Sequence, residues 1–324
     1  MTPDDDYLHT PGADPAFSES MYFHFYDPRA RLGGFLRIGN RPNEGHGEVT
    51  VCLYLPDGRL GFAYEQPRVT SNDRLDAAGM RVEVREPMRH LELAFDGNVT
   101  VVDDPAMMTD PRAALGGSPV RDCSLALSVY AIAPESEHSF DADDVSFVPN
   151  HYEQPIAVDG RIRLAGDTTT IHGHGLRDHT WGPRSWQAPW FYRWVHGCTD
   201  GFGFMGAWFG RQDGSAIRGG FVWDGRVQHR VTAIDLGTVR DDRDEQVEVD
   251  VVLRSDAREW KLHGRARATV PLRHRPTDDT TGKVSMTRIV ESLMSWTLHD
   301  GRELYGMSEY LDQIVDGRPV GLEV

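Results

Sequence analysis

Fifteen consecutive residues, HGHGLRDHTWGPRSW from His172 to Trp186, contain three histidines, one aspartate, two arginines and two tryptophans. Side chains of these types can transfer protons, bind metal ions or hold a cationic intermediate against an aromatic face. Burying an ionisable group costs on the order of several kcal/mol unless it is paired, and perturbed groups of this kind are common at active sites. The segment therefore supplies three candidate catalytic residues, Asp178, His179 and Trp181.

Two interpretations of the charged residues in this segment stay open. Arg177 and Arg184 can form buried ion pairs that fix neighbouring strands, or they can bind substrate beside Asp178. The string Tyr-Glu-Gln-Pro occurs twice in the chain, and its second copy contains Tyr152 and Glu153. We expect Glu153 to be a second candidate acid or base, with Tyr152 as a substrate-binding neighbour.

A metal site is a further possibility in the same segment. His172, His174, Asp178 and His179 offer nitrogen and oxygen ligands. However, the sequence has no HExxH motif, and no second pair of strand histidines is evident. We therefore predict that the protein binds no transition metal and needs no cofactor.

Aromatic residues are concentrated immediately downstream. None of the eight tryptophans precedes Trp181, and five of them lie between Trp181 and Trp208. Most of these rings are expected in the core of a sheet. Trp190, Trp194 and Trp208 are also candidate substrate-binding residues, because the face of an aromatic ring attracts positive charge.

Turn and strand signals predict the elements that must position these side chains. Eight Asp-Gly pairs occur in the chain, often between segments of alternating apolar residues such as Val49–Leu55, and this combination favours tight hairpins. Thr168–Gly175 is a strand candidate, and Gly182-Pro183 is a turn signal after it. Helical turns are expected near Ser71–Gly79 and Pro105–Leu115. The chain is therefore predicted to be all-β, built from antiparallel meanders.

The change in tryptophan distribution suggests a division of the chain into two domains. We place the boundary near Ser185, which gives an N-terminal β-domain of residues 1–185 and a C-terminal β-domain of residues 186–324. A chain of 324 residues is long enough for two domains of ordinary size.

Composition excludes several classes of partner. The formal net charge is −16, whereas nucleic acids and anionic membranes are bound by clustered Lys and Arg. Because the N-terminus, MTPDDDYLHT, is acidic and polar, we expect it not to act as a signal peptide. The chain also lacks the run of roughly 18 apolar residues that stable membrane insertion requires. We expect a cytoplasmic protein with reduced thiols and a small apolar substrate; the sequence leaves the oligomeric state open.

Three stretches carry a resemblance to a known family. They are GHGLRDHTWGPRSW, the preceding HYEQP, and ESMYFHFYDPRARLGGFLRIGNRPNEG near the N-terminus. Together they resemble the AttH-like proteins related to carotenoid 1,2-hydratase (hydroxyneurosporene synthase), from about Glu19 to Leu311. The family includes kievitone hydratase-like enzymes and Diels–Alderases. The resemblance implies two lipocalin-like β-domains with a ligand cleft at or near their junction.

The resemblance also implies a chemistry. In the carotenoid hydratases an acid protonates an isolated alkene, and water then captures the tertiary cation. The shared Asp-His-x-Trp-Gly element implies that His179 and Trp181 line this site. The hydratases carry a downstream Tyr-x-Asp as the proposed proton donor, and this sequence has no counterpart in the stretch that follows Trp181 as far as Asp213. Its nearest acids there, Asp200 and Asp213, lie in predicted hairpin turns.

Taken together, these features predict a cofactor-independent hydratase or dehydratase that acts on an apolar, isoprenoid-like substrate in an inter-domain cleft. Asp178 or Glu153 would transfer the proton, with its pKa raised by burial. His179 would orient the acid or the water, and Trp181 would face the developing cation. One alternative is a cyclase or Diels–Alderase that folds a polyene. Another is a lipid- or terpenoid-binding protein without chemistry.

Overall fold

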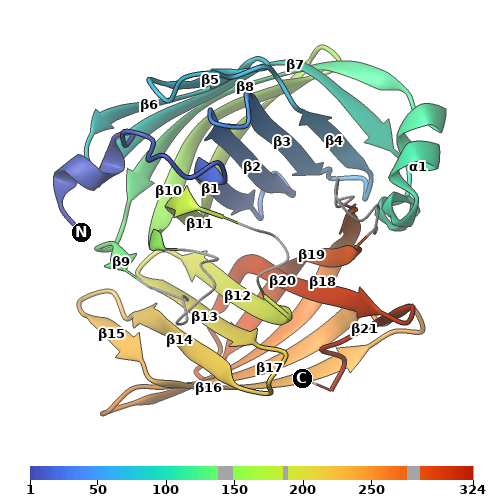
Figure 1. The fold of residues 1–324 in the computed structure, drawn as a ribbon. Coiled ribbons are helices and arrows are strands. Elements are labelled where there is room, and N and C mark those ends of the chain that lie inside the picture. The colour runs from blue at the N-terminus through green and yellow to red at the C-terminus, as the bar shows by residue number, and fades with distance from the viewer. Residues whose placement is uncertain (138–148, 185–188, 276–284, 324) are drawn as a thin grey trace.

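The computed structural model describes residues 1–137, 149–184, 189–275 and 285–323. Two large antiparallel sheets curl toward each other and account for most of the described chain (Figure 1). The all-β prediction is therefore confirmed, with two lipocalin-like β-domains packed together. The first sheet ends at Pro183 and the second begins at Phe191. Ser185, the expected boundary, lies outside the described residues.

The first sheet has eleven strands, and the segments beside it form short helices. In chain order this half contains η1 (Pro3–Asp6), β1 (Phe17–Asp27), β2 (Leu32–Arg41), β3 (His46–Tyr54), β4 (Leu60–Glu65), β5 (Leu75–Ala77), β6 (Met80–Glu86), β7 (His90–Val102), η2 (Pro105–Thr109), α1 (Pro111–Gly117), β8 (Val120–Ala131), β9 (Ser136–Glu137), β10 (Asn150–Leu164) and β11 (Asp167–Pro183). The strands follow the order β4-β3-β2-β1-β11-β10-β8-β7-β6-β5, and β9 pairs with β10. An additional pairing of β4 with β7 closes eight of these strands into a ring.

The second sheet has ten strands and curls under the first. It contains β12 (Phe191–Thr199), β13 (Phe202–Gly210), β14 (Ala216–Trp223), β15 (Gln228–Val231), β16 (Ala233–Arg240), β17 (Gln246–Arg254), β18 (Glu259–His274), β19 (Thr287–Leu298), β20 (Glu303–Val315) and β21 (Arg318–Pro319). Its order is β15-β14-β13-β12-β20-β19-β18-β17-β16, with β21 on β20.

Six of the eight Asp-Gly pairs connect consecutive strands, as the sequence predicts. The other two, which begin at Asp96 and Asp159, lie inside the long strands β7 and β10. Gly160 shows why a glycine stands in a strand interior: a Cβ there would lie 2.1 Å from the carbonyl oxygen of Ala126 on β8. The residue is needed for close backbone approach rather than for a turn.

The two expected helical turns have different outcomes. Pro105–Leu115 is confirmed, because η2 and α1 cover it and each begins with a proline. Ser71–Gly79 is wrong: it contains β5, and Ala78 and Gly79 both adopt positive φ, at 46° and 81°. Two successive positive φ angles form the tight turn of a β-hairpin, and the hairpin joins β5 to β6.

Apolar residues form three clusters, in the ring, between the sheets and inside the second sheet. Strand β1 contributes to two of them, because alternate side chains point to opposite faces. Phe23 and Phe25 pack inside the ring, whereas Tyr22 packs between the sheets beside Phe35 and Trp194. We call the region between the two sheets the seam. Burial of β1 on both faces explains its nearly continuous buried pattern.

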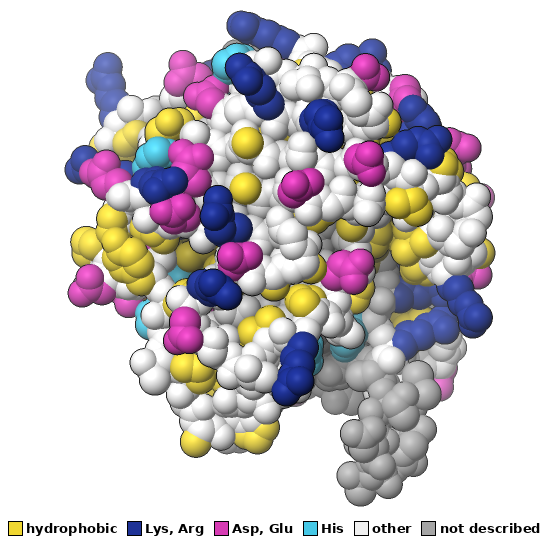
Figure 2. Space-filling model, turned by 90° about the horizontal axis from the view of Figure 1, so that it is seen from above, with side chains coloured by type: hydrophobic (Ala, Val, Ile, Leu, Met, Phe, Trp, Pro, Cys, Tyr) yellow, Lys and Arg dark blue, Asp and Glu magenta, His cyan; other side chains and the backbone are white. Residues whose placement is uncertain are grey.

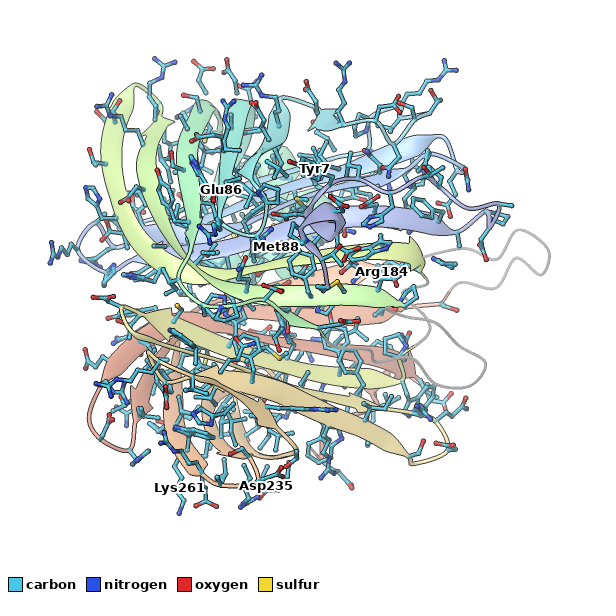
Figure 3. The ribbon with its side chains drawn as sticks, turned by 90° about the vertical axis from the view of Figure 1, so that its left-hand side faces the viewer. Tyr7, Glu86, Met88, Arg184, Asp235 and Lys261 are labelled. Carbon is cyan, nitrogen blue, oxygen red and sulfur yellow. The ribbon has the colours of Figure 1, made fainter. Side chains whose placement is uncertain are left out.

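The N-terminal segment is tied to the ring by a buried charge. Asp6 is fully buried and accepts hydrogen bonds from Arg177 at 2.7 Å, from the Tyr152 hydroxyl and from the Met88 amide. Figure 3 shows the segment at Tyr7 beside Met88. Burial opposes ionisation of Asp6, but the charge and hydrogen bonds of Arg177 outweigh it, so the pKa of Asp6 lies below its ordinary value.

The three cysteines of the chain all lie within the described residues. Cys52, Cys123 and Cys198 are all buried and unbridged. Among the described residues no helix combines the length and the apolar character that crossing a membrane demands.

Replacing Asp6 by asparagine is expected to destabilise the fold. Asp6→Asn leaves the buried guanidinium of Arg177 without its counter-charge, which costs about 3–5 kcal/mol. Urea unfolding followed by circular dichroism measures this loss. Asp4→Asn, at an exposed position in the same turn, is the matched control and should stay near the wild type. Equal stability of the two variants would contradict the assignment.

Candidate active site

Most of the charged segment identified in the sequence, from His172 to Pro183, belongs to the single strand β11. Its side chains therefore alternate between the two faces of that strand. The register pairs Asp178 with Glu153 on β10, and His179 with Tyr152. Asp178 and Glu153 point into the seam. Arg177, His179 and Tyr152 point to the opposite face, where they contact the N-terminal segment and β1. The strand therefore separates residues that are adjacent in the sequence.

A cavity of about 310 Å³ lies in the seam and is the candidate active site. Strands from both sheets and the helices η2 and α1 contribute to it. Its apolar wall consists of Phe35, Phe62, Met108, Pro111, Leu115, Phe209, Leu272 and Ile289, with Tyr22, Tyr64, Tyr192 and Trp194 as further aromatic residues. Its polar wall consists of Arg37, Glu48, Thr50, His151, Glu153, Asp178, Thr180, Arg184, Arg273, His274, Glu291 and Glu309.

Two of the acids expected from the sequence line this cavity. Burial raises the pKa of Asp178, and the nearby His151 and Arg184 only partly oppose the shift. Glu153 accepts a hydrogen bond of 2.6 Å from the indole Nε1 of Trp194. This contact crosses the seam, because Glu153 belongs to the first sheet and Trp194 to β12 of the second. It holds the tryptophan ring at the cavity wall.

Three acids of the cavity were not identified from the sequence: Glu48, which is paired with Arg37 at 2.7 Å, Glu291 on β19 and Glu309 on β20. Burial raises the pKa of the Glu291 and Glu309 carboxyls to about 8, so both are largely protonated at neutral pH. Glu309 accepts a hydrogen bond from the Tyr192 hydroxyl. Among the described residues, Glu291 Oε2 has no hydrogen-bond partner. A glutamate within the apolar run IVESLM was the available signal for Glu291.

A histidine and an arginine complete the polar wall near Asp178. His151 Nδ1 lies 2.9 Å from Thr180 Oγ1, and its Nε2 lies 3.5 Å from Glu153 Oε1. Burial lowers the pKa of His151 to about 4, so the ring is neutral at neutral pH. Burial also lowers the pKa of Arg184, to about 10, and the guanidinium remains charged. The cavity thus holds neutral proton-transfer groups together with the cation of Arg184, and Arg37 and Arg273 also line it.

The opposite face of β11 carries the other residues singled out in the motif. Arg177 donates to Asp6 and, through Nε and Nη2, to Gln154 Oε1 at 2.9 and 2.7 Å. His179 Nε2 lies 2.9 Å from Glu19 Oε1. Trp181 stacks on His9, with ring centroids 4.0 Å apart. None of these side chains is part of the seam cavity as the described residues define it.

The three downstream tryptophans also have different surroundings. Trp194 lines the seam cavity. Trp208 is on β13, and its side chain packs against the core of the second sheet rather than in the seam. The guanidinium of Arg218 lies over its ring, 3.6 Å from the centroid. Trp190 precedes β12 and joins neighbouring strands through backbone hydrogen bonds to Gly210 and Gln313.

The four residues weighed as metal ligands in the sequence do not converge. His172 bonds to Asp159 at 2.7 Å in an exposed part of β11. Asp178 and His179 point to opposite faces further along the strand. Chemically, the seam cavity therefore combines a wall of aliphatic and aromatic side chains with protonated carboxyls, a neutral imidazole and the guanidinium groups of three arginines. Such a pocket can protonate an unactivated substrate and shield the resulting cation from bulk water.

Three solved structures are similar to this chain over nearly its whole length. A putative AttH from Nitrosomonas europaea has a TM-score of 0.61 at 14% identity, covering 93% of this chain and 94% of that one. The structure of CghA with Sch210972 has a TM-score of 0.52 at 10% identity, with 94% and 90% covered. Kievitone hydratase from Nectria haematococca has a TM-score of 0.52 at 9% identity, with 100% and 94% covered.

At these identities the likeness shows a shared fold, and it confirms the resemblance to the AttH-like proteins. A comparison with the curated proteins found no match. A family model described as a domain of unknown function, DUF7064, matches residues 2–314. The chain therefore belongs to the DUF7064 family.

Proposed function

We propose that this protein is a cofactor-independent hydro-lyase that hydrates an alkene, or dehydrates an alcohol, of an apolar isoprenoid-like substrate in the seam cavity. One observation carries this proposal: Asp178, Glu291 and Glu309 converge from both sheets on a cavity that has one wall of aliphatic and aromatic side chains. Carboxyls placed in this way are the groups that general acid catalysis of such a reaction needs.

The reaction can be written with residues of this chain alone. A protonated carboxyl, Glu291 or Glu309, gives its proton to one alkene carbon, and a C–H bond forms while the π bond breaks. Water adds to the resulting tertiary cation through its oxygen. The proton that this water loses passes to Asp178 or Glu153, directly or through the neutral ring of His151, and then returns to the donor. Dehydration follows the same steps in reverse.

Aromatic rings in the cavity support a cationic intermediate. The Trp194 ring is held in place by its hydrogen bond to Glu153, and Tyr22 meets it edge-on at 5.5 Å. Ring faces of this kind attract positive charge without competing as nucleophiles. We assign Trp194 the role that the resemblance gave to Trp181, and we propose that Trp181 and His179 act from behind β11 by holding it in register.

Two other functions stay candidates. A cyclase or Diels–Alderase would use Arg184 to polarise a carbonyl and the apolar wall to fold a polyene. A lipid- or terpenoid-binding protein would use the cavity without chemistry. The fold of kievitone hydratase, a hydratase by name, favours the lyase.

We propose the cytoplasm as the location, and neither nucleic acid nor membrane as a partner. The net charge of −16 supports the second statement, and the three buried, unbridged cysteines support the first. On the face drawn in Figure 2, Lys and Arg side chains are scattered among Asp and Glu side chains, which is unlike the clustered basic surface of a nucleic-acid-binding protein.

Heavy-oxygen water distinguishes the three functions. Apolar material that stays bound during purification would be extracted, identified by mass spectrometry and returned to the protein in this water. A hydro-lyase incorporates the heavy oxygen into the alcohol, or exchanges it there. A cyclase changes the substrate without incorporation, and a binding protein returns it unchanged. Either of the last two results would overturn the lyase proposal.

Substitution of the seam carboxyls should remove turnover and leave the fold intact. Glu291→Gln keeps the shape and neutrality of the protonated acid, so the melting temperature is expected to stay near that of the wild type while kcat falls by about 10²-fold or more. Asp178→Asn should behave similarly. Glu303→Gln, at an exposed position, is the control. Wild-type turnover in Asp178→Asn, Glu291→Gln and Glu309→Gln alike would contradict the mechanism.

The rate should also depend on pH in one direction. Glu291 and Glu309 are active as donors in their protonated forms, and their pKa values lie at about 8. Turnover is therefore expected to be level below that pH and to fall about tenfold per pH unit above it. Initial rates between pH 6 and about 10, with circular dichroism as a check of folding, measure this. A rate that rises through pH 8 would instead indicate that Glu291 or Glu309 acts as a base in its ionised form, which would contradict its role as the proton donor.

A further inference from the structure

We propose that His9, Glu19 and His179 form a binding site for a divalent metal ion, zinc by the nature of its donors, on the face of β11 opposite to the seam cavity. The site is separate from the proposed chemistry. It would join the N-terminal segment, β1 and β11 through a single ion.

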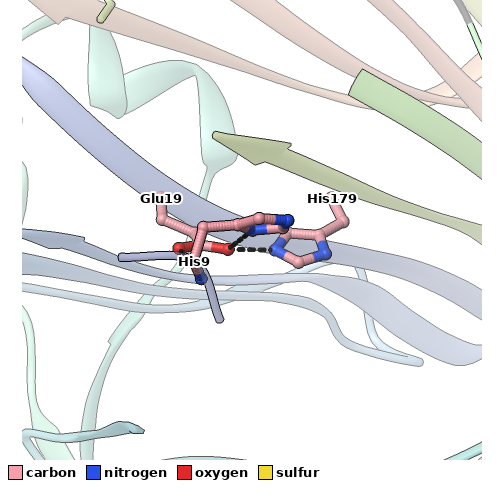
Figure 4. A group of neighbouring side chains, drawn as sticks. All are labelled: His9, Glu19 and His179. Atoms are coloured by element: carbon pink, nitrogen blue, oxygen red, sulfur yellow. Dashed lines mark hydrogen bonds and ion pairs between the residues drawn. The ribbon is translucent and has the colours of Figure 1, made fainter. Parts of the chain in front are cut away.

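The donor atoms already converge. Glu19 Oε1 lies 2.8 Å from His9 Nδ1 and 2.9 Å from His179 Nε2 (Figure 4). One donor atom from each of the three residues can be chosen so that all lie within 4.8 Å of one another. Two imidazole nitrogens and one carboxylate oxygen are a common zinc donor set, and bond lengths of about 2.0–2.2 Å require only small movements from this arrangement.

Each proposed ligand also has a partner for the atom that would not bind the metal. Asp5 Oδ1 lies 3.6 Å from His9 Nε2, and the Tyr152 hydroxyl lies 3.4 Å from His179 Nδ1. The second carboxylate oxygen of Glu19 accepts hydrogen bonds from the His9 amide and from Asn72. Outer contacts of this kind orient metal ligands and fix the tautomers of ligating histidines.

These outer contacts provide hydrogen-bond acceptors for the ring protons of His9 and His179 when a metal is bound. Without metal, His9 Nδ1–H and His179 Nε2–H can each donate a hydrogen bond to the same oxygen of Glu19. When the ion binds there, each neutral ring must carry its proton on the other nitrogen. Asp5 can accept that proton's hydrogen bond from His9, and the Tyr152 oxygen can accept the one from His179. The ion can therefore replace the two hydrogen bonds without burying an unpaired N–H group.

Burial around the cluster leaves one open side. The side chains of Glu19 and His179 have no exposed surface, whereas that of His9 is 25% exposed. Trp181 covers the other side of the His9 ring in a nearly parallel stack, with an angle of 7°. An ion can enter beside His9, and one water can complete a four-coordinate shell. The crowded stack leaves less room for the six ligands that magnesium prefers.

The location explains why the sequence analysis predicted no metal. His9, Glu19 and His179 come from three distant parts of the chain, and no spacing motif links them. His9 meets the other two because the N-terminal segment is anchored to the ring, at Asp6 through Arg177 and at the His9 carbonyl through Asn72. A metal at this site would stabilise the folded chain in proportion to the logarithm of its free concentration.

The test measures zinc binding and thermal stability in untagged protein that has been stripped with chelator and returned to zinc chloride. We expect one zinc per chain by elemental analysis, and a rise in melting temperature of about 3 °C or more at saturation. Two variants keep the hydrogen bond to Glu19 and remove the metal ligand: His9→Asn places an amide at the position of Nδ1, and His179→Gln places one at the position of Nε2.

Each variant should fold, lose at least about 100-fold in zinc affinity and show no zinc-dependent rise in melting temperature. His172→Asn, which changes an exposed histidine of the same strand, is the control and should bind like the wild type. Cobalt in place of zinc should give the intense visible absorption of a four-coordinate site in the wild type and in His172→Asn, and in neither His9→Asn nor His179→Gln. Wild-type protein that takes up no zinc, or variants that bind it equally well, would show that the cluster is only a hydrogen-bonded anchor and would overturn the proposal.

Discussion

The pairing of β11 between β1 and β10 is the constraint on which the rest of the structure depends. Both neighbours are antiparallel to it, and together they hydrogen-bond most of its length. From Gly175 to Gly182 its residues are buried or half-buried, so each face of the strand is packed against protein or lines the cavity. One face supplies the seam with Asp178. The other anchors the N-terminal segment through Arg177 and His179.

The pKa values of buried carboxyls shift in opposite directions on the two sides of β11. Behind β11, Asp6 and Glu19 are buried against Arg177 and histidines, which hold the pKa of both carboxyls below the ordinary range, that of Glu19 at about 2. In the seam, burial raises the pKa of Glu291 and Glu309 to about 8. The difference comes from partners rather than from burial alone, because a paired charge is stabilised where an unpaired one is not. Anchoring and proton donation can therefore be separated across one strand.

Contacts across the seam join the two sheets around the cavity. Trp194 of the second sheet donates to Glu153 of the first, and His24 and His196 meet edge to face at 5.0 Å beside them. The acids with the largest upward shifts come from the second sheet, whereas Asp178 comes from the first. A proposed reaction that uses both therefore requires the two sheets to be packed as they are, and neither sheet alone provides the donor and the acceptor.

The sequence by itself determined the all-β class, most of the hairpins and the segment in which charged and aromatic residues concentrate, since these depend on local pattern. It also identified Asp178, Glu153, Arg184 and Trp194, which line the cavity. It could not show that Asp178 and His179 serve different faces, because the register and extent of β11 depend on pairing with distant strands. Nor could it select Glu291 and Glu309. An acid in a strand becomes a proton donor only when tertiary packing removes water and counter-charges from it.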